Sequence, residues 1–143
     1  MSIQEQEQTK KEYYSEAMRY MDNARECLQK AKKEDDTYLD KKYVKMACGT
    51  AYSGILVALD CFLILKGKDK PKGKLRKSIE HYQSNITKID KKLLNNLNNA
   101  YEILHLWGYY DGIGSVNVVK EGFDTAFKII EKIKPSEYML TEN

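Results

Sequence analysis

The chain has 143 residues, of which 42% are hydrophobic and 31% charged, with eight Gly and two Pro; this composition is typical of one compact soluble domain and not of a disordered tail. The net charge is +3, and only three of the 24 cationic residues are Arg, which disfavours sequence-specific nucleic-acid recognition because Lys lacks the planar fork that reads bases. Cys27, Cys48 and Cys61 form no C-x-x-C pair, which argues against a secreted disulfide framework or a cysteine-based zinc site and indicates reduced thiols in the cytoplasm.

Apolar residues recur at spacings of three and four along the chain, and no stretch sustains a strict alternation. This periodicity predicts an all-α protein with five helices. The first helix is expected from about residue 5 to residue 33, with one apolar stripe on an otherwise charged surface. The residues before it are polar and lack the apolar core of a signal peptide. A polar break at residues 34–37 follows.

The second helix is expected over residues 39–65. From Ala51 onward it is apolar nearly all round, which predicts a central helix packed on several sides. Its apolar run is too short and too interrupted for a membrane span. Gly49, Ser53 and Gly54 are small enough to let a neighbouring helix approach closely.

The rest of the chain is predicted to hold three further helices. A loop at residues 67–73 leads to a short third helix that ends near residue 86. The fourth helix carries an apolar stripe over residues 93–108, and a Gly-rich break follows it. Asn117 is the expected N-cap of a fifth helix, which ends at Pro135.

Together these elements predict an antiparallel four-helix bundle with an additional short helix. One domain spans residues 1–143, with an ordered core at about residues 5–134. The tail at residues 135–143 is expected to be frayed.

Two segments resemble those of a known family. The run AYSGILVAL at residues 51–59, continuing to Lys66-Gly67, resembles the central helix of HEPN domains, with its Ala-Tyr pair, small residues, apolar run and closing Gly. Residues 108–111, Gly-Tyr-Tyr-Asp before an amphipathic helix, resemble the Ala-Asp-Tyr stretch and last helix of HEPN modules that accompany nucleotidyltransferases. The resemblance covers about residues 47–134 and implies a five-helix, HEPN-like fold.

The resemblance implies several functions, because many HEPN domains pair as dimers, some are ribonucleases, and others bind nucleotides or a partner. The ribonucleases carry an Arg followed four to six residues later by a His, near the start of the penultimate long helix. The string of this form here joins Arg76 to His81 in the short third helix, and five helical residues would put the two on different faces. Where the family has an Arg and an Asp in the fourth helix, this chain has His105 and Tyr109. These departures favour a non-enzymatic module.

The alternative is a metal-independent ribonuclease of a toxin–antitoxin type system. In that case His81 or His105 would be the general acid or base on a ribose 2′-hydroxyl, and Arg76 would stabilise the charge of the phosphorane. Glu102 and His105 also form the half-motif of a di-iron bundle, but the required second copy is not in the sequence. Neither a metal nor a cofactor is therefore expected.

Asp60 interrupts the most apolar helix and lies in line with Ser53 at a spacing of seven. A buried carboxylate must meet a cation, a hydroxyl or water. A Tyr hydroxyl or a Lys is the favoured partner; a dimer or partner groove and a ligand site are the alternatives. Asp60, Ser53 and the Tyr109-Tyr110 pair are therefore the interface or pocket candidates, since partly exposed tyrosines favour a protein interface.

Residues 66–77 carry seven cations and one acid, which raises the local potential for phosphates or an acidic partner. A solvated loop is the alternative interpretation. The anion-binding candidates of this segment are Lys70, Lys72, Lys74, Arg76 and Lys77.

The sequence thus predicts a non-enzymatic HEPN-like helical module. It is expected to form a homodimer or to dock on a protein partner such as a nucleotidyltransferase-like protein. Binding of a nucleotide or of RNA phosphate is a weaker expectation.

Overall fold

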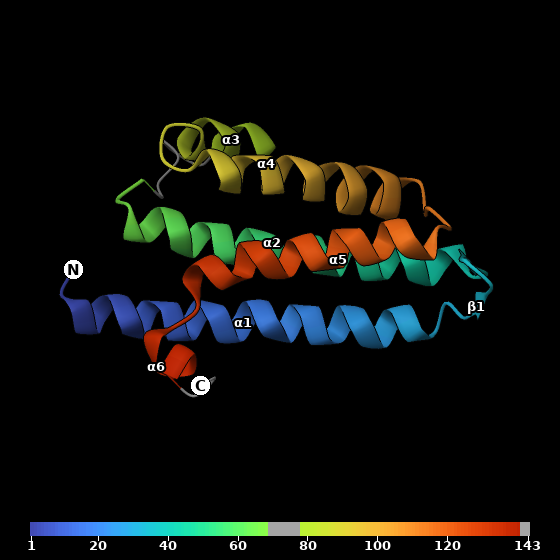
Figure 1. Cartoon of the computed structure of the whole chain (residues 1–143), viewed down its shortest axis with the longest axis horizontal. Coiled ribbons are helices and arrows are strands. Elements are labelled where there is room, and N and C mark those ends of the chain that lie inside the picture. The colour runs from blue at the N-terminus through green and yellow to red at the C-terminus, as the bar shows by residue number, and fades with distance from the viewer. Residues whose placement is uncertain (69–77, 141–143) are drawn as a thin grey trace.

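Apart from one short hairpin, the described elements of this computed structural model are helices (Figure 1). The structure describes residues 1–68 and 78–140. The elements in chain order are α1 (Ile3–Gln29), β1 (Lys33–Glu34), β2 (Thr37–Tyr38), α2 (Lys41–Leu65), α3 (Ile79–Ile86), α4 (Lys91–Ala100), the π-helix η1 (Tyr101–Tyr110), α5 (Val116–Ile130), the 3₁₀ turn η2 (Glu131–Ile133) and α6 (Ser136–Leu140).

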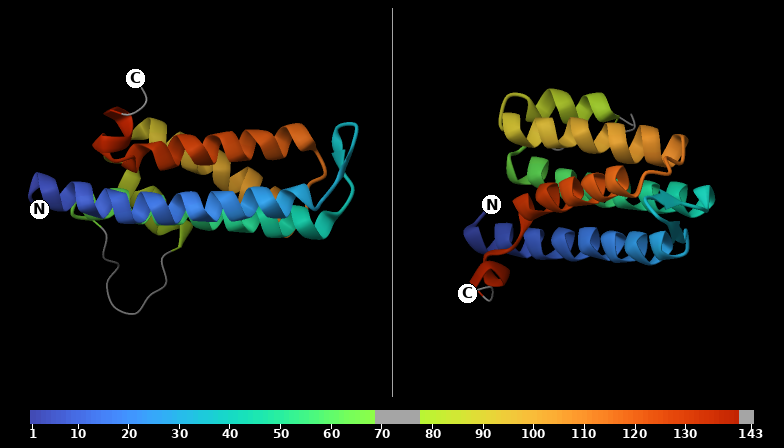
Figure 2. Two further views of the ribbon diagram at one scale, coloured as in Figure 1. Left: turned by 90° about the horizontal axis from the view of Figure 1, so that it is seen from below. Right: turned by 45° about the vertical axis from the view of Figure 1, so that its right-hand side comes forward.

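The central position predicted for the second helix is confirmed. α2 packs against α1, α3, η1 and α5, and Figure 2 shows it running alongside α1 with α4 on its other side. Ile55, Leu59 and Leu63 are among the largest fully buried side chains of the protein. Burial of one such side chain contributes about 1.5–3 kcal/mol, so α2 organises the core of an all-α bundle.

Contrary to the expectation from the sequence, α2 is long and apolar enough to cross a membrane by length and composition, with a mean hydropathy of 1.8 over 18 residues. More than half of that window, 56%, is buried inside the bundle. Packing against α1, α3, η1, α5 and η2 accounts for its apolar composition without a membrane.

Side-chain caps begin the long helices. The Asp40 carboxylate accepts from the Lys42 N–H at 3.1 Å at the start of α2, and Asp90 accepts from the Leu93 N–H at 2.9 Å at the start of α4. The cap of α5 is Ser115, whose Oγ accepts from the Val118 N–H at 3.3 Å. The prediction of Asn117 as this cap was therefore wrong, because the extended backbone that a cap needs occurs two residues earlier.

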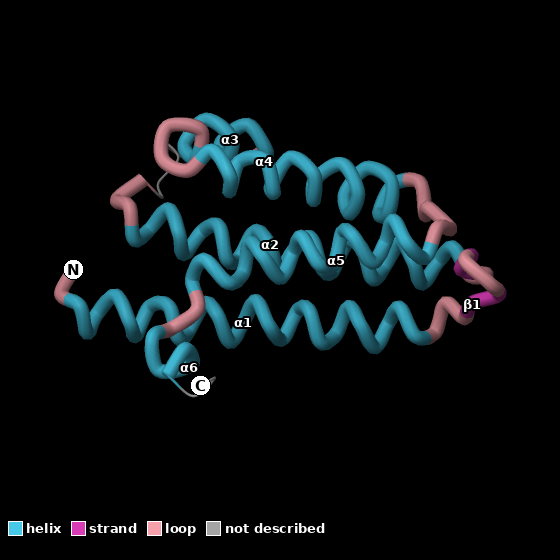
Figure 3. Tube along the Cα trace, in the orientation of Figure 1, coloured by secondary structure: helices cyan, strands magenta, loops and turns pink. Residues whose placement is uncertain are grey.

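The hairpin after α1 was not predicted from the sequence. The first helix ends at Gln29 instead of near residue 33, and Lys32 takes a left-handed conformation with φ 54°. The chain then forms β1 and β2 around a turn in which Asp35 has φ 55°. The Tyr38 N–H donates to the Gly114 carbonyl at 2.8 Å, which fixes the hairpin to the loop before α5 at one end of the bundle (Figure 3).

Within the tail at residues 135–143, which was predicted to be frayed, residues 136–140 are helical, and residues 141–143 lie outside the described part of the chain. Residues 136–140 form α6, which lies against α1 (Figure 1). The Glu7 carboxylate accepts from the Ser136 N–H at 3.0 Å and from its hydroxyl at 2.8 Å, and the rings of Tyr14 and Tyr138 are 5.6 Å apart. The residues of each contact lie more than 120 positions apart in sequence, so a local sequence pattern cannot predict these contacts.

Candidate functional site

The π-helix η1 continues directly from α4 and forms one wall of the bundle against α2. Backbone hydrogen bonds of a π-helix run from residue i to i+5, and such segments are frequent at functional sites. Side chains four and five positions apart therefore lie nearly above one another on the same side of η1. Tyr101, His105, Tyr109 and Tyr110 occupy such positions.

Their rings form a continuous cluster. His105 stacks between Tyr101 and Tyr109, at centroid distances of 5.2 and 5.8 Å and interplanar angles of 26° and 14°. The Tyr110 ring meets His105 edge-on at 4.9 Å, and Tyr52 of α2 lies 4.8 Å from the same imidazole. We call these five side chains, Tyr52, Tyr101, His105, Tyr109 and Tyr110, the aromatic patch.

Glycines bring η1 close to α2. A Cβ at Gly108 would lie 2.5 Å from Cys48 Cβ and from Cys48 Sγ, so only Gly fits where the two helices touch. A Cβ at Gly49 would lie 2.7 Å from Cδ1 of Tyr109, so this ring rests on the backbone of α2. The close approach predicted for Gly49 is thus seen, with η1 as the neighbouring helix.

Burial differs from one end of the aromatic patch to the other. Tyr52 is 8% exposed, whereas Tyr109 and Tyr110 are 47% and 60% exposed. Burial raises the pKa of the Tyr52 phenol, and the nearby Tyr101 and Glu80 add to the effect. Burial also lowers the pKa of His105, so its imidazole is neutral at pH 7 and the patch carries no charge.

The patch brings together two of the four predicted interface candidates, Tyr109 and Tyr110. Ser53 is half-buried and donates its hydroxyl to the Gly49 carbonyl at 3.1 Å within α2. Asp60 accepts a 2.8 Å hydrogen bond from the Tyr82 hydroxyl of α3, which is the kind of partner favoured from the sequence. Both hydrogen bonds join residues of this chain, so the side-chain oxygens of Ser53 and Asp60 have partners within the bundle.

The alternative catalytic residues are not grouped within the described residues. His105 belongs to the aromatic patch, whereas His81 lies on α3, where its imidazole Nδ1 is 3.4 Å from the Asn85 side-chain nitrogen and its ring meets Tyr82 edge-on. Arg76 lies outside the described residues. The same holds for the other anion-binding candidates, Lys70, Lys72, Lys74 and Lys77.

No group of three His, Cys, Asp or Glu side chains is placed for a metal ion in residues 1–68 and 78–140. Glu102 is exposed, and His105 is surrounded by tyrosines. Cys48 and Cys61 are buried free thiols, and burial raises the pKa of each to about 12. At neutral pH these thiols stay protonated and are poor nucleophiles.

Tyr52 and Tyr101 were not among the candidates named from the sequence. The spacing of Tyr101, His105 and Tyr109, each four residues from the next, would have indicated the row of rings. The contribution of Tyr52 from another helix has no such local signal.

Comparison with known proteins gives a family but no activity. A solved structure of a protein of unknown function from Dyadobacter fermentans is similar to this chain, with a TM-score of 0.75 and 44% identity over 87% of this chain and 94% of that one. No curated protein matches the chain. Residues 12–135 match the model of the family described as Domain of unknown function (DUF5618). The chain therefore belongs to the DUF5618 family.

Proposed function

We propose that this chain is a non-enzymatic, HEPN-like helical module that pairs with a second copy of itself through the aromatic patch. The observation that carries the proposal is the exposure of Tyr109 and Tyr110, 47% and 60%, at the edge of a cluster whose other rings are largely covered. Tyr is enriched at protein interfaces because its ring supplies apolar area at a low entropy cost.

The surface beside the patch extends the apolar area. Met46 lies one helical turn before Gly49 on α2 and is 51% exposed. Tyr109 rests on Gly49, so Met46 and Tyr109 lie on neighbouring parts of the same face. An apolar centre of this kind is typical of the buried core of an interface.

The absence of charge on the patch favours a second copy as the occupant. His105 is neutral at pH 7 because burial lowers its pKa. The aromatic patch therefore offers no electrostatic attraction to a charged partner. A two-fold interface places the same residues of both copies against each other. Contacts between uncharged tyrosine rings of the two copies, edge to face or offset, stabilise an interface by about 0.5–1.5 kcal/mol for each pair of rings.

The surroundings of the basic residues support a binding role over catalysis. In the described part of the chain the arginines are Arg19 and Arg25, both on α1. Arg19 pairs with Glu16 at 2.6 Å, and the Arg25 guanidinium lies 4.4 Å from the Phe127 ring centre. The guanidinium groups of both arginines thus contact other side chains than His81 and His105.

Light scattering after size exclusion, over a range of concentrations, tests the proposal. We expect a dimer for the wild type and a monomer for the double variant Tyr109→Ser/Tyr110→Ser. Trp107→Ser is the matched control, because Trp107 is also exposed on η1, at 38%, but points to another side of the helix. A wild type that stays monomeric at high micromolar concentration would overturn the proposal.

An RNA-cleavage assay on the same samples addresses the alternative function. We expect no cleavage by the wild type. Cleavage that is lost in both His81→Ala and His105→Ala would instead establish the ribonuclease.

A further inference from the structure

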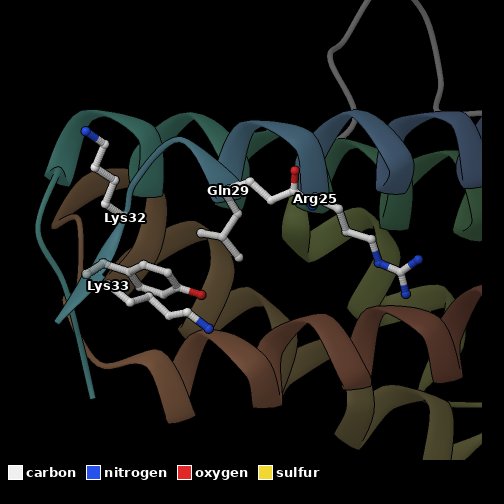
Figure 4. Close-up of a pocket in the computed structure, with 6 residues that line it drawn as sticks. Arg25, Gln29, Lys32 and Lys33 are labelled. Carbon is white, nitrogen blue, oxygen red and sulfur yellow. The ribbon is translucent and has the colours of Figure 1, made fainter. Parts of the chain in front are cut away.

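A shallow hollow of about 430 Å³ lies at the end of α1 beside the hairpin (Figure 4). Its lining combines three cations and two neutral donors with apolar surface. The lining residues are Arg25, Leu28, Gln29, Lys32, Lys33 and Tyr38. This volume lies within the usual range for small-molecule sites.

The hollow is strongly one-sided in charge. Arg25, Lys32 and Lys33 line it, and no carboxylate does. None of these three forms an ion pair within residues 1–68 and 78–140. The end of α1 contributes only about half a negative charge from its dipole, so the local field remains positive.

The hairpin separates its own charges. Lys33 and Tyr38 are cross-strand partners and project from the same face, whereas Glu34 and Thr37 form the next pair and project from the opposite face. The left-handed backbone of Lys32, with φ 54°, turns the chain so that Lys33 returns across the end of α1. A non-glycine residue held in this conformation is uncommon.

Figure 4 shows Arg25 and Lys33 on the same side of the end of α1, with Lys32 pointing away from them. The Arg25 guanidinium is held over the Phe127 ring at 4.4 Å. Backbone hydrogen bonds from Leu39 to the Lys32 carbonyl and from Asp40 to the Ala31 carbonyl, at 3.1 and 3.0 Å, fix the returning strand. The hollow is therefore formed before any ligand arrives.

We propose that this hollow binds a small molecule that carries a phosphate group on an apolar or aromatic body. Lys33 binds the phosphate oxygens through its mobile ammonium, and the Arg25 guanidinium, at the other end of the hollow, adds to the positive field. Leu28 and the ring of Tyr38 contact the apolar body. Burial raises the pKa of Tyr38, so its hydroxyl keeps its proton and remains a donor. The site is separate from the aromatic patch and does not depend on self-association.

Phenyl phosphate and inorganic phosphate are suitable probes, titrated into ¹⁵N-labelled protein at constant ionic strength. We expect saturable shifts of the amide signals of residues 25–33 and 38 with phenyl phosphate, at a dissociation constant of the order of 1 mM. Inorganic phosphate should bind about tenfold more weakly, because it lacks the apolar body. Phosphate that binds as tightly as phenyl phosphate, or no saturable shift with either probe, would overturn the proposal.

Charge variants locate the site. Lys33→Gln is expected to weaken binding of phenyl phosphate about fivefold or more, and Arg25→Gln to weaken it by less, through loss of the positive field alone. Lys32→Gln should have a smaller effect, because its ammonium points away in Figure 4. Lys88→Gln removes the same charge between α3 and α4, at the other end of the bundle (Figure 1), and should leave binding unchanged.

Two further outcomes are decisive. Unchanged binding in Lys33→Gln, at an exposed position, would contradict the proposal even if Arg25→Gln lost binding, because Arg25→Gln also removes the packing on Phe127. Weakening by Lys88→Gln equal to that by Lys33→Gln would show general charge attraction and contradict a site. An RNA oligonucleotide that shifts these signals where phenyl phosphate does not would assign the hollow to RNA and refute the small-molecule proposal.

Discussion

The Tyr109 ring rests on Gly49 so closely that a Cβ at position 49 would lie 2.7 Å from Tyr109 Cδ1. A side chain on η1 is thereby held flat against α2, and half of it remains exposed. The proposed pairing surface depends on this contact, because it sets the position of the outermost rings of the aromatic patch.

Gly49→Ala should therefore weaken self-association more than it affects folding. Ala gains up to about 1 kcal/mol of helix propensity over Gly, and the exposed Tyr109 ring can move aside. We expect the free energy of unfolding to change by less than about 1 kcal/mol, and the dimer dissociation constant to rise about fivefold or more. Chemical denaturation and sedimentation velocity measure the two effects. An unchanged dissociation constant would show that the position of Tyr109 does not matter for pairing.

Gly108→Ala should affect folding directly. The added Cβ would lie 2.5 Å from Cys48 Cβ and Sγ and 3.1 Å from the Ile103 carbonyl, all within the core. Overpacking of this kind costs about 1–3 kcal/mol. Urea denaturation, with Gly49→Ala as the control for the same chemical change at an accessible contact, should show the loss for Gly108→Ala alone. Equal stabilities would mean that η1 and α2 do not approach as closely as the structure places them.

Tyr82→Phe removes the hydroxyl that donates to Asp60 at 2.8 Å. Hydrogen bonds to charged groups contribute more than neutral ones, and we expect a loss of about 1–2 kcal/mol. Tyr43→Phe is the matched control, because the Tyr43 hydroxyl forms no hydrogen bond with a described residue. The difference in thermal unfolding between the two variants measures the bond. A Tyr82→Phe protein as stable as Tyr43→Phe would contradict its structural role.

The stability of the protein should decrease on mild acidification. Burial lowers the pKa of His105 from its ordinary value of 6.5, so the folded state favours the neutral imidazole while the unfolded chain binds a proton more readily. This contribution is complete above the unfolded pKa and is lost as the pH falls from about 6.5 through the folded pKa. His105→Gln should flatten the stability profile between pH 7 and 5. An identical slope in wild type and variant would show that His105 does not titrate in this way.

The architecture could be predicted from the sequence because α2 differs from the other helices in the distribution of its apolar residues. Its apolar residues cover nearly the whole circumference from Ala51 onward, and only a central position satisfies such a helix. The hairpin at residues 33–38 could not be predicted in this way. Its two strands of two residues each are too short for a periodicity, and its position is set by the bond from Tyr38 to Gly114.

The aromatic patch was only half predictable. Tyr109 and Tyr110 are adjacent in sequence and could be named as interface candidates. The spacing of four places Tyr109 in line with Tyr101 and His105 on an α-helix as well, but Tyr110, five residues after His105, joins the row only because η1 is a π-helix. Tyr52 joins them only because α2 and η1 are in contact at Gly49 and Gly108.

Isotope-filtered NMR on a mixture of labelled and unlabelled protein tests most directly whether two copies meet through these rings. Intermolecular contacts should be observed between the Tyr109 and Tyr110 rings of one copy and the same rings or Met46 of the other. They should disappear in Tyr109→Ser/Tyr110→Ser. Intermolecular contacts confined to other helices, or none at a concentration of several hundred micromolar, would contradict pairing through the patch.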